Sequence, residues 1–197
     1  PHYRKAWCDW WADGIGAGAD ELALVKKSQE SMAFSDLLFS VSGFGIGADG
    51  ERFRDELSAA YRTALLFDEH TYGAYNSISQ PYSLRAKHGW LYKSSFAASL
   101  SWQSALIEDA ALSGLIWDIP TEADPVLAVV NPLPWKRTCF LSFKLPRSVV
   151  ESMRPFKLLA SESGGELCCQ QVGEETLWLH MIAVVPDVPA CGYRTFR

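Results

Sequence analysis

The chain has 197 residues, of which 48% are hydrophobic and 21% are charged, and it carries a net charge of −5. This composition is ordinary for a globular protein and excludes the disordered and collagen-like classes. The acidic balance argues against a general nucleic-acid binder, and the sequence contains no apolar run of about eighteen residues, the length a membrane-spanning helix requires.

The first part of the chain has a helical period. Ala19 is followed by two acidic residues in what would be a first turn, where negative charge is favourable. Apolar residues then recur at seven-residue spacing: Val25, Met32 and Phe39. Residues 43–50 contain four glycines, too many for a helix interior, and predict a connection.

Two more helices are predicted before residue 119. In the second helix, apolar residues stand at steps of three and four: Phe53, Leu57, Ala60, Ala64 and Phe67. It is expected to end near Gly73, and residues 76–81 are expected to form a loop. The third and longest helix begins after Pro81 and presents one apolar face, formed by Phe96, Leu100, Ile107, Ala110 and Trp117. Three such helices predict a three-helix bundle over residues 19–118.

The pattern changes after residues 119–125, where two prolines and polar spacers predict a linker. Short runs rich in β-branched and aromatic residues follow, at 126–130, 138–145, 156–160, 177–185 and 191–197. Turn signals between the runs include Pro146, Gly164-Gly165 and Gly173. We therefore expect the start of an antiparallel β-sandwich over residues 126–197, one that continues past this sequence. The whole acidic excess lies before Ile119, which also indicates an α+β chain of differently built domains.

The five cysteines show no CxxC spacing, and Cys168 and Cys169 are adjacent. This pattern argues against a zinc ribbon, and the odd number mildly favours a reducing, cytoplasmic compartment.

A histidine stands at the predicted end of the second helix, in Asp68-Glu69-His70-Thr71-Tyr72-Gly73. An imidazole beside carboxylates can hold a metal ion at a pocket wall. A zinc site needs three or four ligands, however, and no His-x-x-x-His or cysteine pair completes one here. The other interpretation is an ordinary solvated or hydrogen-bonded histidine. His88 and His180 have no partners in the sequence and are expected in core or surface roles.

A tryptophan-rich segment opens the chain: Ala6-Trp7-Cys8-Asp9-Trp10-Trp11-Ala12-Asp13-Gly14. Pyranose rings stack on indole faces, and carboxylates accept hydrogen bonds from sugar hydroxyls, so Trp10, Trp11, Asp9 and Asp13 are candidate sugar contacts. The alternative is that the indoles anchor the segment on a protein core while the aspartates are solvated. Residues 14–18 are rich in glycine, but they lie in no βαβ unit and do not fit a dinucleotide loop.

Four segments, in this order, resemble glycoside hydrolase family 38, the α-mannosidases. Residues 3–14 resemble a stretch late in the catalytic domain, and His70 follows about sixty residues later, at an interval similar to the family's. Val130-Asn131-Pro132-Leu133-Pro134-Trp135-Lys136-Arg137 resembles the segment that opens the β domain. Val188-Pro189-Ala190-Cys191-Gly192-Tyr193-Arg194-Thr195-Phe196 resembles a Pro-x-x-Gly-Tyr strand of that domain.

The resemblance implies a retaining hydrolase whose catalytic barrel lies upstream of this sequence. Residues 1–18 are then the end of the catalytic domain. The barrel supplies the nucleophile and two zinc ligands, so this chain alone is expected to be inactive. His70 maps to a further zinc ligand, and the implied contacts with the glycan substrate are Asp9, Trp10, Trp11, Asp13, Glu69 and Thr71. No nucleic-acid or membrane partner is expected.

The sequence departs from the family at one point and leaves other functions open. The family commonly has His-Asp where this chain has His70-Thr71, and a hydroxyl brings no charge to the sugar. One alternative is a non-catalytic carbohydrate-binding or scaffold module built on the early tryptophans. Another is a helical interaction domain in which Glu69 and His70 are ordinary surface residues.

Overall fold

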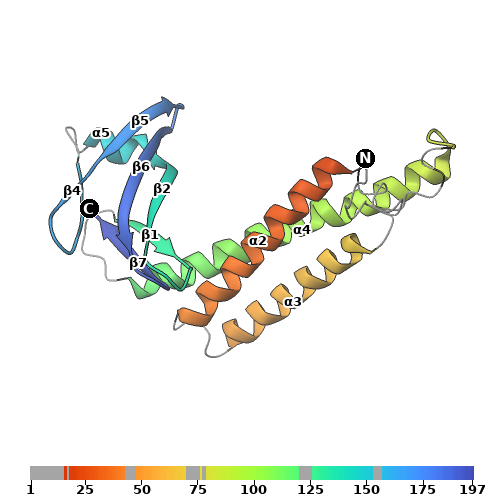
Figure 1. Ribbon diagram of the computed structural model, residues 1–197, viewed down its shortest axis with the longest axis horizontal. Helices are drawn as coiled ribbons and strands as arrows, with labels where there is room; N and C mark the ends of the chain where they lie inside the picture. The colour runs from red at the N-terminus through yellow and green to blue at the C-terminus, as the bar shows by residue number, and fades with distance from the viewer. Residues whose placement is uncertain are drawn as a thin grey trace, which may run out of the picture. The chain divides into compact units, whose positions relative to one another are not determined.

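The computed structural model describes Gly16, residues 18–42, 48–69, Asn76, and residues 79–119, 126–152 and 157–197. The chain divides into two compact units, Pro1–Asp118 and Ile119–Arg197 (Figure 1). The first unit is helical and the second consists mainly of antiparallel strands. The predicted α+β class is confirmed. Among the described helices, none is long and apolar enough to cross a membrane.

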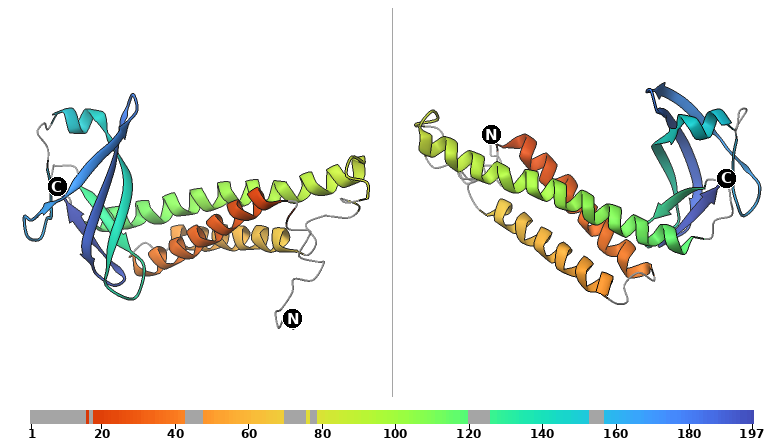
Figure 2. Two further views of the ribbon diagram at one scale, coloured as in Figure 1. Left: turned by 45° about the horizontal axis from the view of Figure 1, so that its top comes forward. Right: turned by 180° about the vertical axis from the view of Figure 1, so that it is seen from behind.

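The helical unit contains α2 (Ala19–Val41), α3 (Ala48–Asp68) and α4 (Leu84–Asp118). Helices α2 and α3 each pack against α4, and the views of Figure 2 show the three side by side. Helix α4 begins after Pro81, as predicted. Ser83 caps it, because its Oγ accepts a hydrogen bond of 3.2 Å from the backbone N–H of Ala86.

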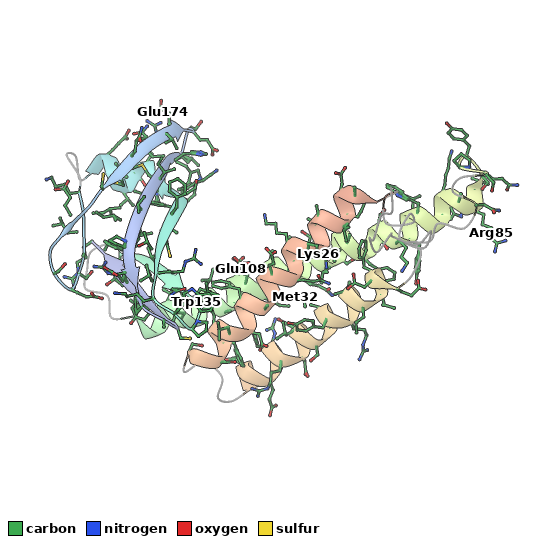
Figure 3. The ribbon with its side chains drawn as sticks, viewed as in Figure 1. Lys26, Met32, Arg85, Glu108, Trp135 and Glu174 are labelled. Atoms are coloured by element: carbon green, nitrogen blue, oxygen red, sulfur yellow. The ribbon has the colours of Figure 1, made fainter. Side chains whose placement is uncertain are left out.

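The predicted apolar positions form the core of the helical unit. Met32 of α2, labelled in Figure 3, is fully buried, and all the apolar residues that the period of α2 and α3 singled out are buried. The rings of Phe39 and Phe53 stack at a centroid distance of 4.1 Å and join these two helices. Each fully buried side chain of this size contributes roughly 1.5–3 kcal/mol to folding.

One helix boundary differs from the prediction. Residues 43–50 were expected to form a connection, but α3 begins at Ala48, and Gly50 lies in its first turn. Asp49 and Glu51 stand in the same turn, where their charges favour the N-terminal end of a helix. Glycine costs least near a helix end, so its presence there did not prevent the helix from starting.

The second unit contains three small antiparallel sheets and a short helix. Strand β1 (Leu127–Asn131) pairs with β7 (Gly192–Phe196). Strands β2 (Arg137–Pro146), β6 (Trp178–Val188) and β5 (Cys169–Glu174) form a sheet in the order β2-β6-β5. Strands β3 (Leu158–Leu159) and β4 (Glu166–Leu167) form a third pair, and α5 spans Arg147–Ser152.

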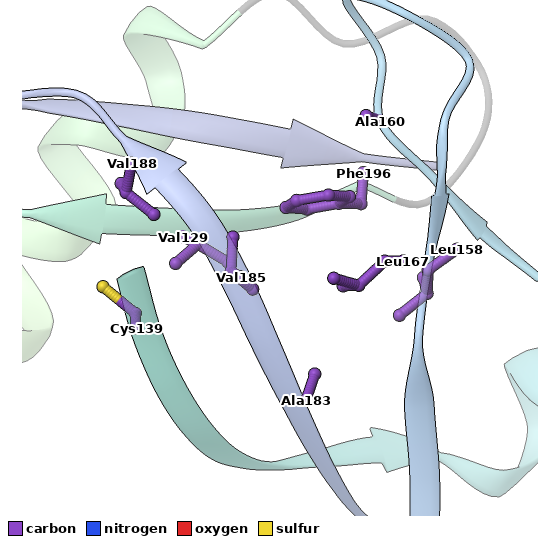
Figure 4. Packing of buried hydrophobic residues seen from close by; sticks show 9 residues of the cluster. All are labelled: Val129, Cys139, Leu158, Ala160, Leu167, Ala183, Val185, Val188 and Phe196. Carbon is purple, nitrogen blue, oxygen red and sulfur yellow. The ribbon is translucent and has the colours of Figure 1, made fainter. Parts of the chain in front are cut away.

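The core of this unit lies on one face of β6, where alternate residues are buried: Leu179, Met181, Ala183 and Val185. Figure 4 shows the main cluster, in which Val185 lies beside Val129 of β1 and near Phe196 of β7, and to which Ala183 also belongs. The runs predicted at 126–130, 138–145, 177–185 and 191–197 correspond to β1, β2, β6 and β7 and are confirmed.

Strands β4 and β5 and helix α5 were not predicted, and the turn predicted at Gly173 was wrong. Gly173 was expected in a turn but lies in β5, at a register shift opposite His180. A Cβ at this position would meet His180 Cβ at 3.6 Å, an ordinary contact, so the glycine marks the irregularity of the strand and not a crowded site. Strand β4 and helix α5 have only two and six residues, too few to show a period.

Candidate functional site

The predicted site residues fall mostly outside the described part of the chain. Glu69 is described, whereas Asp9, Trp10, Trp11, Asp13, His70 and Thr71 lie outside it. The structure therefore describes the helix end that leads into His70, together with the β-strand motifs.

Lys93 of α4 caps the C-terminal end of α3. This residue is 4% exposed, and its Nζ donates hydrogen bonds to the carbonyl oxygens of Leu66 at 2.8 Å and Glu69 at 2.9 Å. A longer contact of 3.4 Å reaches the carbonyl of Phe67. The last carbonyls of a helix have no partner within it, and a cation there is also favoured by the helix dipole. Lys93 thus supplies the partners that α3 itself lacks.

The same ammonium group forms an ion pair with the side chain of Glu69. Its Nζ lies 2.8 Å from Glu69 Oε2, in a pair whose lysine side chain is 5% exposed and whose glutamate side chain is 51% exposed. The structure therefore gives Glu69 a role in ending α3, beside its predicted contact with substrate. Because Lys93 holds both the backbone and the side chain of Glu69, it fixes the residue that directly precedes His70.

A buried asparagine joins the two β-strand motifs. Asn131 is 1% exposed, and its Nδ2 donates to the carbonyls of Trp135 at 2.8 Å and Pro189 at 2.9 Å, with a longer contact of 3.3 Å to Val188. Its Oδ1 accepts from the backbone N–H of Leu133 at 3.2 Å, as in an Asx turn. One side chain therefore connects the turn at residues 131–135 to the turn that precedes β7.

The backbone reinforces this junction. Asn131 is the register partner of Gly192, and the N–H of Cys191 donates to the carbonyl of Leu133 at 2.9 Å. A Cβ on Gly192 would lie 3.0 Å from Pro189 Cγ, closer than ordinary contact allows. The two motifs are thus parts of one structural element, which we call the Asn131 junction (residues 131–135 and 188–192). The hydrogen bonds of the Asn131 junction give it a structural role, which is to hold the two turns together.

A polar cluster on the sheet surface was missed by the sequence analysis. Glu175 Oε1 lies 2.9 Å from Lys144 Nζ and 2.8 Å from His180 Nε2. The hydrogen bond from Lys144, followed by that from His180, lowers the pKa of the Glu175 carboxyl. His180 therefore has a partner, contributed by the turn between β5 and β6, and His180 itself sits opposite Lys144 in the ladder between β2 and β6. All three groups are at the surface, and the cluster ties that turn to β2.

The adjacent cysteines border a hollow of about 490 Å³, together with Met181, Lys157 and Glu166. Burial first, and then the neighbouring Cys168 and Glu166, raise the pKa of the Cys169 thiol. A raised pKa disfavours the thiolate, the form that acts as nucleophile and metal ligand. The Cys169 thiol therefore does not have the lowered pKa of a nucleophilic cysteine.

Among the described side chains, no group of three or more His, Cys, Asp or Glu residues is placed to hold a metal ion.

No family model, no curated protein and no solved structure matches this chain.

Proposed function

We propose that this chain is the central part of a zinc-dependent, retaining glycoside hydrolase of the α-mannosidase type. Residues 1–18 end its catalytic domain, residues 19–118 form its three-helix bundle, and residues 126–197 begin its β-sandwich. The observation that carries the proposal is the Asn131 junction. The two segments that resemble the family's β domain are far apart in the sequence, and they meet through Asn131, which donates to the carbonyls of Val188 and Pro189.

The end of α3 supports the proposal that His70 is a zinc ligand. In the proposed enzyme, His70 would hold zinc together with ligands from the upstream barrel, and zinc would supply Lewis-acid binding of sugar hydroxyls. Lys93 anchors the backbone at Glu69, one residue before this histidine. A metal ligand gains from such an anchor, because it must be held within a fraction of an ångström of its working position.

The remaining proposed contacts orient the sugar. Asp9 and Asp13 accept hydrogen bonds from hydroxyls, and Trp10 and Trp11 stack on the ring. Thr71 offers a hydroxyl where the family has an aspartate. The nucleophile and the acid come from the upstream barrel, so the chain by itself binds and positions but does not cleave.

The proposal is tested by assaying an aryl α-mannoside with two proteins: this chain, and a longer protein that includes the upstream barrel. We expect hydrolysis by the longer protein and none by this chain. Hydrolysis by this chain alone would contradict the domain assignment, and an inactive longer protein that binds no mannoside would contradict the substrate class.

The same preparations test the alternative, a non-catalytic carbohydrate-binding module. It predicts that this chain binds oligosaccharide without a metal, and that Trp10→Ala and Trp11→Ala abolish the binding while a chelator does not. The tryptophan-rich segment at residues 7–11 is the feature that favours this alternative.

A further inference from the structure

Helix α4 has two apolar faces. One face packs on α2 and α3 and includes Lys93, Ala97, Leu100, Ser104, Ile107 and Ala111, all buried. A second set of large apolar side chains on α4 is exposed: Leu84 73%, Leu91 56%, Trp102 68%, Leu106 49% and Ile116 59%. We call these five residues the outer stripe.

The outer stripe lies opposite the buried face. At 3.6 residues per turn, its five members project within about 80° of one another, roughly half a turn away from Leu100 and Ala111. A surface helix normally carries polar residues there, whereas a helix that is apolar all round is normally covered on both sides. Exposed large apolar side chains gathered along one side of a helix, with the small exposed residues Ser95 and Ala98 between them, favour an interaction surface.

Charges along α4 are distributed unevenly. The first part carries Arg85, Lys87 and His88, whereas Glu108 and Asp109 lie in the second half, and Figure 3 shows Arg85 and Glu108 in these places. Lys87, His88 and Asp109 are exposed; at 3.6 residues per turn, His88 and Asp109 project on the same side of α4 as the outer stripe, and Lys87 lies at its edge. In a parallel pair of such helices, like charges would face each other. In an antiparallel pair, the basic part of each helix faces the acidic part of the other.

We infer that a second copy of this chain covers the outer stripe, through antiparallel pairing of two α4 helices about a two-fold axis. With the axis near Ala98 and Ser99, Trp102 of one copy meets the small residues Ser95 and Ala98 of the other, and Leu91 meets Leu106. His88 then faces Asp109. In a two-fold dimer each contact between two different residues occurs twice, so each favourable contact contributes twice to the stability of the dimer.

The extent of the contact suits a stable pair. The outer stripe runs along about 48 Å of helix, from Leu84 to Ile116. A crossing angle of about 20° is one of the preferred classes for two helices packed along their length. The inference does not depend on the proposed enzymatic function.

The test uses the full chain, with its mass in solution measured by sedimentation equilibrium over a concentration series. We expect a dimer, and we expect Trp102→Glu to weaken it by on the order of 100-fold, since a central aromatic contact is replaced by a charge on both copies. Leu65→Glu is the matched control, because Leu65 is 70% exposed on α3, away from the outer stripe, and should leave the dimer intact. Circular dichroism shows whether each variant is folded.

A charge exchange tests the direction of pairing. Asp109→Lys should weaken the dimer, and combining it with Lys87→Glu and His88→Glu should restore the association. A folded protein that stays monomeric at every concentration would overturn the inference, as would a dimer that Trp102→Glu leaves unchanged. Failure of the charge exchange to restore association would overturn the antiparallel arrangement.

Discussion

At the scale of single residues, Asn131 shows how a side chain can fix a junction between distant segments. Its amide nitrogen donates to the carbonyls of Trp135 and Pro189, and its amide oxygen accepts from Leu133. An aspartate has the same shape but cannot donate at neutral pH. It would place a carboxylate against carbonyl oxygens in a site that is 1% exposed. The identity of this residue is therefore set by its ability to donate.

We expect Asn131→Asp to lower the free energy of unfolding by about 2–4 kcal/mol, since a buried group loses its partners and gains a charge. Urea denaturation at neutral pH measures the change. Gln170→Glu is the control, because it makes the same chemical change at an exposed position of β5 and should alter stability by less than about 0.5 kcal/mol. Equal effects of the two substitutions would contradict the role assigned to Asn131.

The lowered pKa of Glu175 predicts that the stability of the β-strand unit depends on pH. Its folded-state pKa is lowered, mainly by the hydrogen bond from Lys144, below the ordinary value of 4.5. The interaction therefore stabilises the fold above that ordinary pKa, and the stabilisation is lost as the pH falls through the lower folded-state pKa.

Thermal melts across the acid range test this expectation. The wild-type chain should lose more stability between neutral and acid pH than Glu175→Gln does, because the amide does not titrate. The difference should be small, since the groups are exposed and screened. A Glu175→Gln variant with the full acid dependence of the wild type would contradict the assignment.

At the scale of elements, α3 ends where a neighbouring helix supplies partners for its carbonyls. Replacing Lys93 by methionine keeps most of the side-chain volume but removes the donors to Leu66 and Glu69 and the partner of the Glu69 carboxylate. We expect Lys93→Met to lower the free energy of unfolding of the helical unit by about 2–4 kcal/mol.

The change is measured by urea denaturation, followed by circular dichroism at a helical wavelength. Lys87→Met serves as the matched control, because Lys87 is exposed on the same helix and should have an effect below about 0.5 kcal/mol. If the Lys93 variant were as stable as the control, the end of α3 would have to be set by something other than this lysine.

Elements with a sustained period were predicted correctly from the sequence. Helix α2 begins at Ala19 as expected, and the strands β1, β2, β6 and β7 lie where β-branched and aromatic runs indicated. The predictions missed short elements, such as α5, and strands without a clear pattern, such as β5, whose sequence is Cys-Gln-Gln-Val-Gly-Glu. Glycine was also overvalued as a breaker, because Gly50 lies in the first turn of α3 and Gly173 lies at a register shift of β5.

The candidate site was predictable only in part, for a related reason. The motifs around Glu69 and Asn131 stand out in the sequence, but their partners do not. Lys93 is 24 residues from Glu69, and Pro189 is 58 residues from Asn131, so only the fold brings each pair together. Hydrogen bonds over such separations leave no periodic signal.

At the scale of the whole molecule, the two units have different roles in the proposed enzyme. The helical unit holds the backbone that leads into His70, and the β-strand unit is organised around the Asn131 junction. In the proposed enzyme, this chain places one zinc ligand and several sugar contacts, while the upstream barrel carries the bond-breaking groups. The dimer inferred through α4 is a separate property of the helical unit, and it can hold or fail without affecting the enzymatic proposal.

The zinc content of a protein that joins the proposed upstream barrel to this chain tests the proposal of a zinc-dependent hydrolase. It is measured by elemental analysis for the wild type, His70→Ala and the matched control His88→Ala. We predict about one zinc per chain in the wild type and in the control, and loss of the zinc together with α-mannosidase activity in His70→Ala, because one of the few zinc ligands is gone. Unchanged zinc content and unchanged activity in the His70→Ala protein would refute the role proposed for His70.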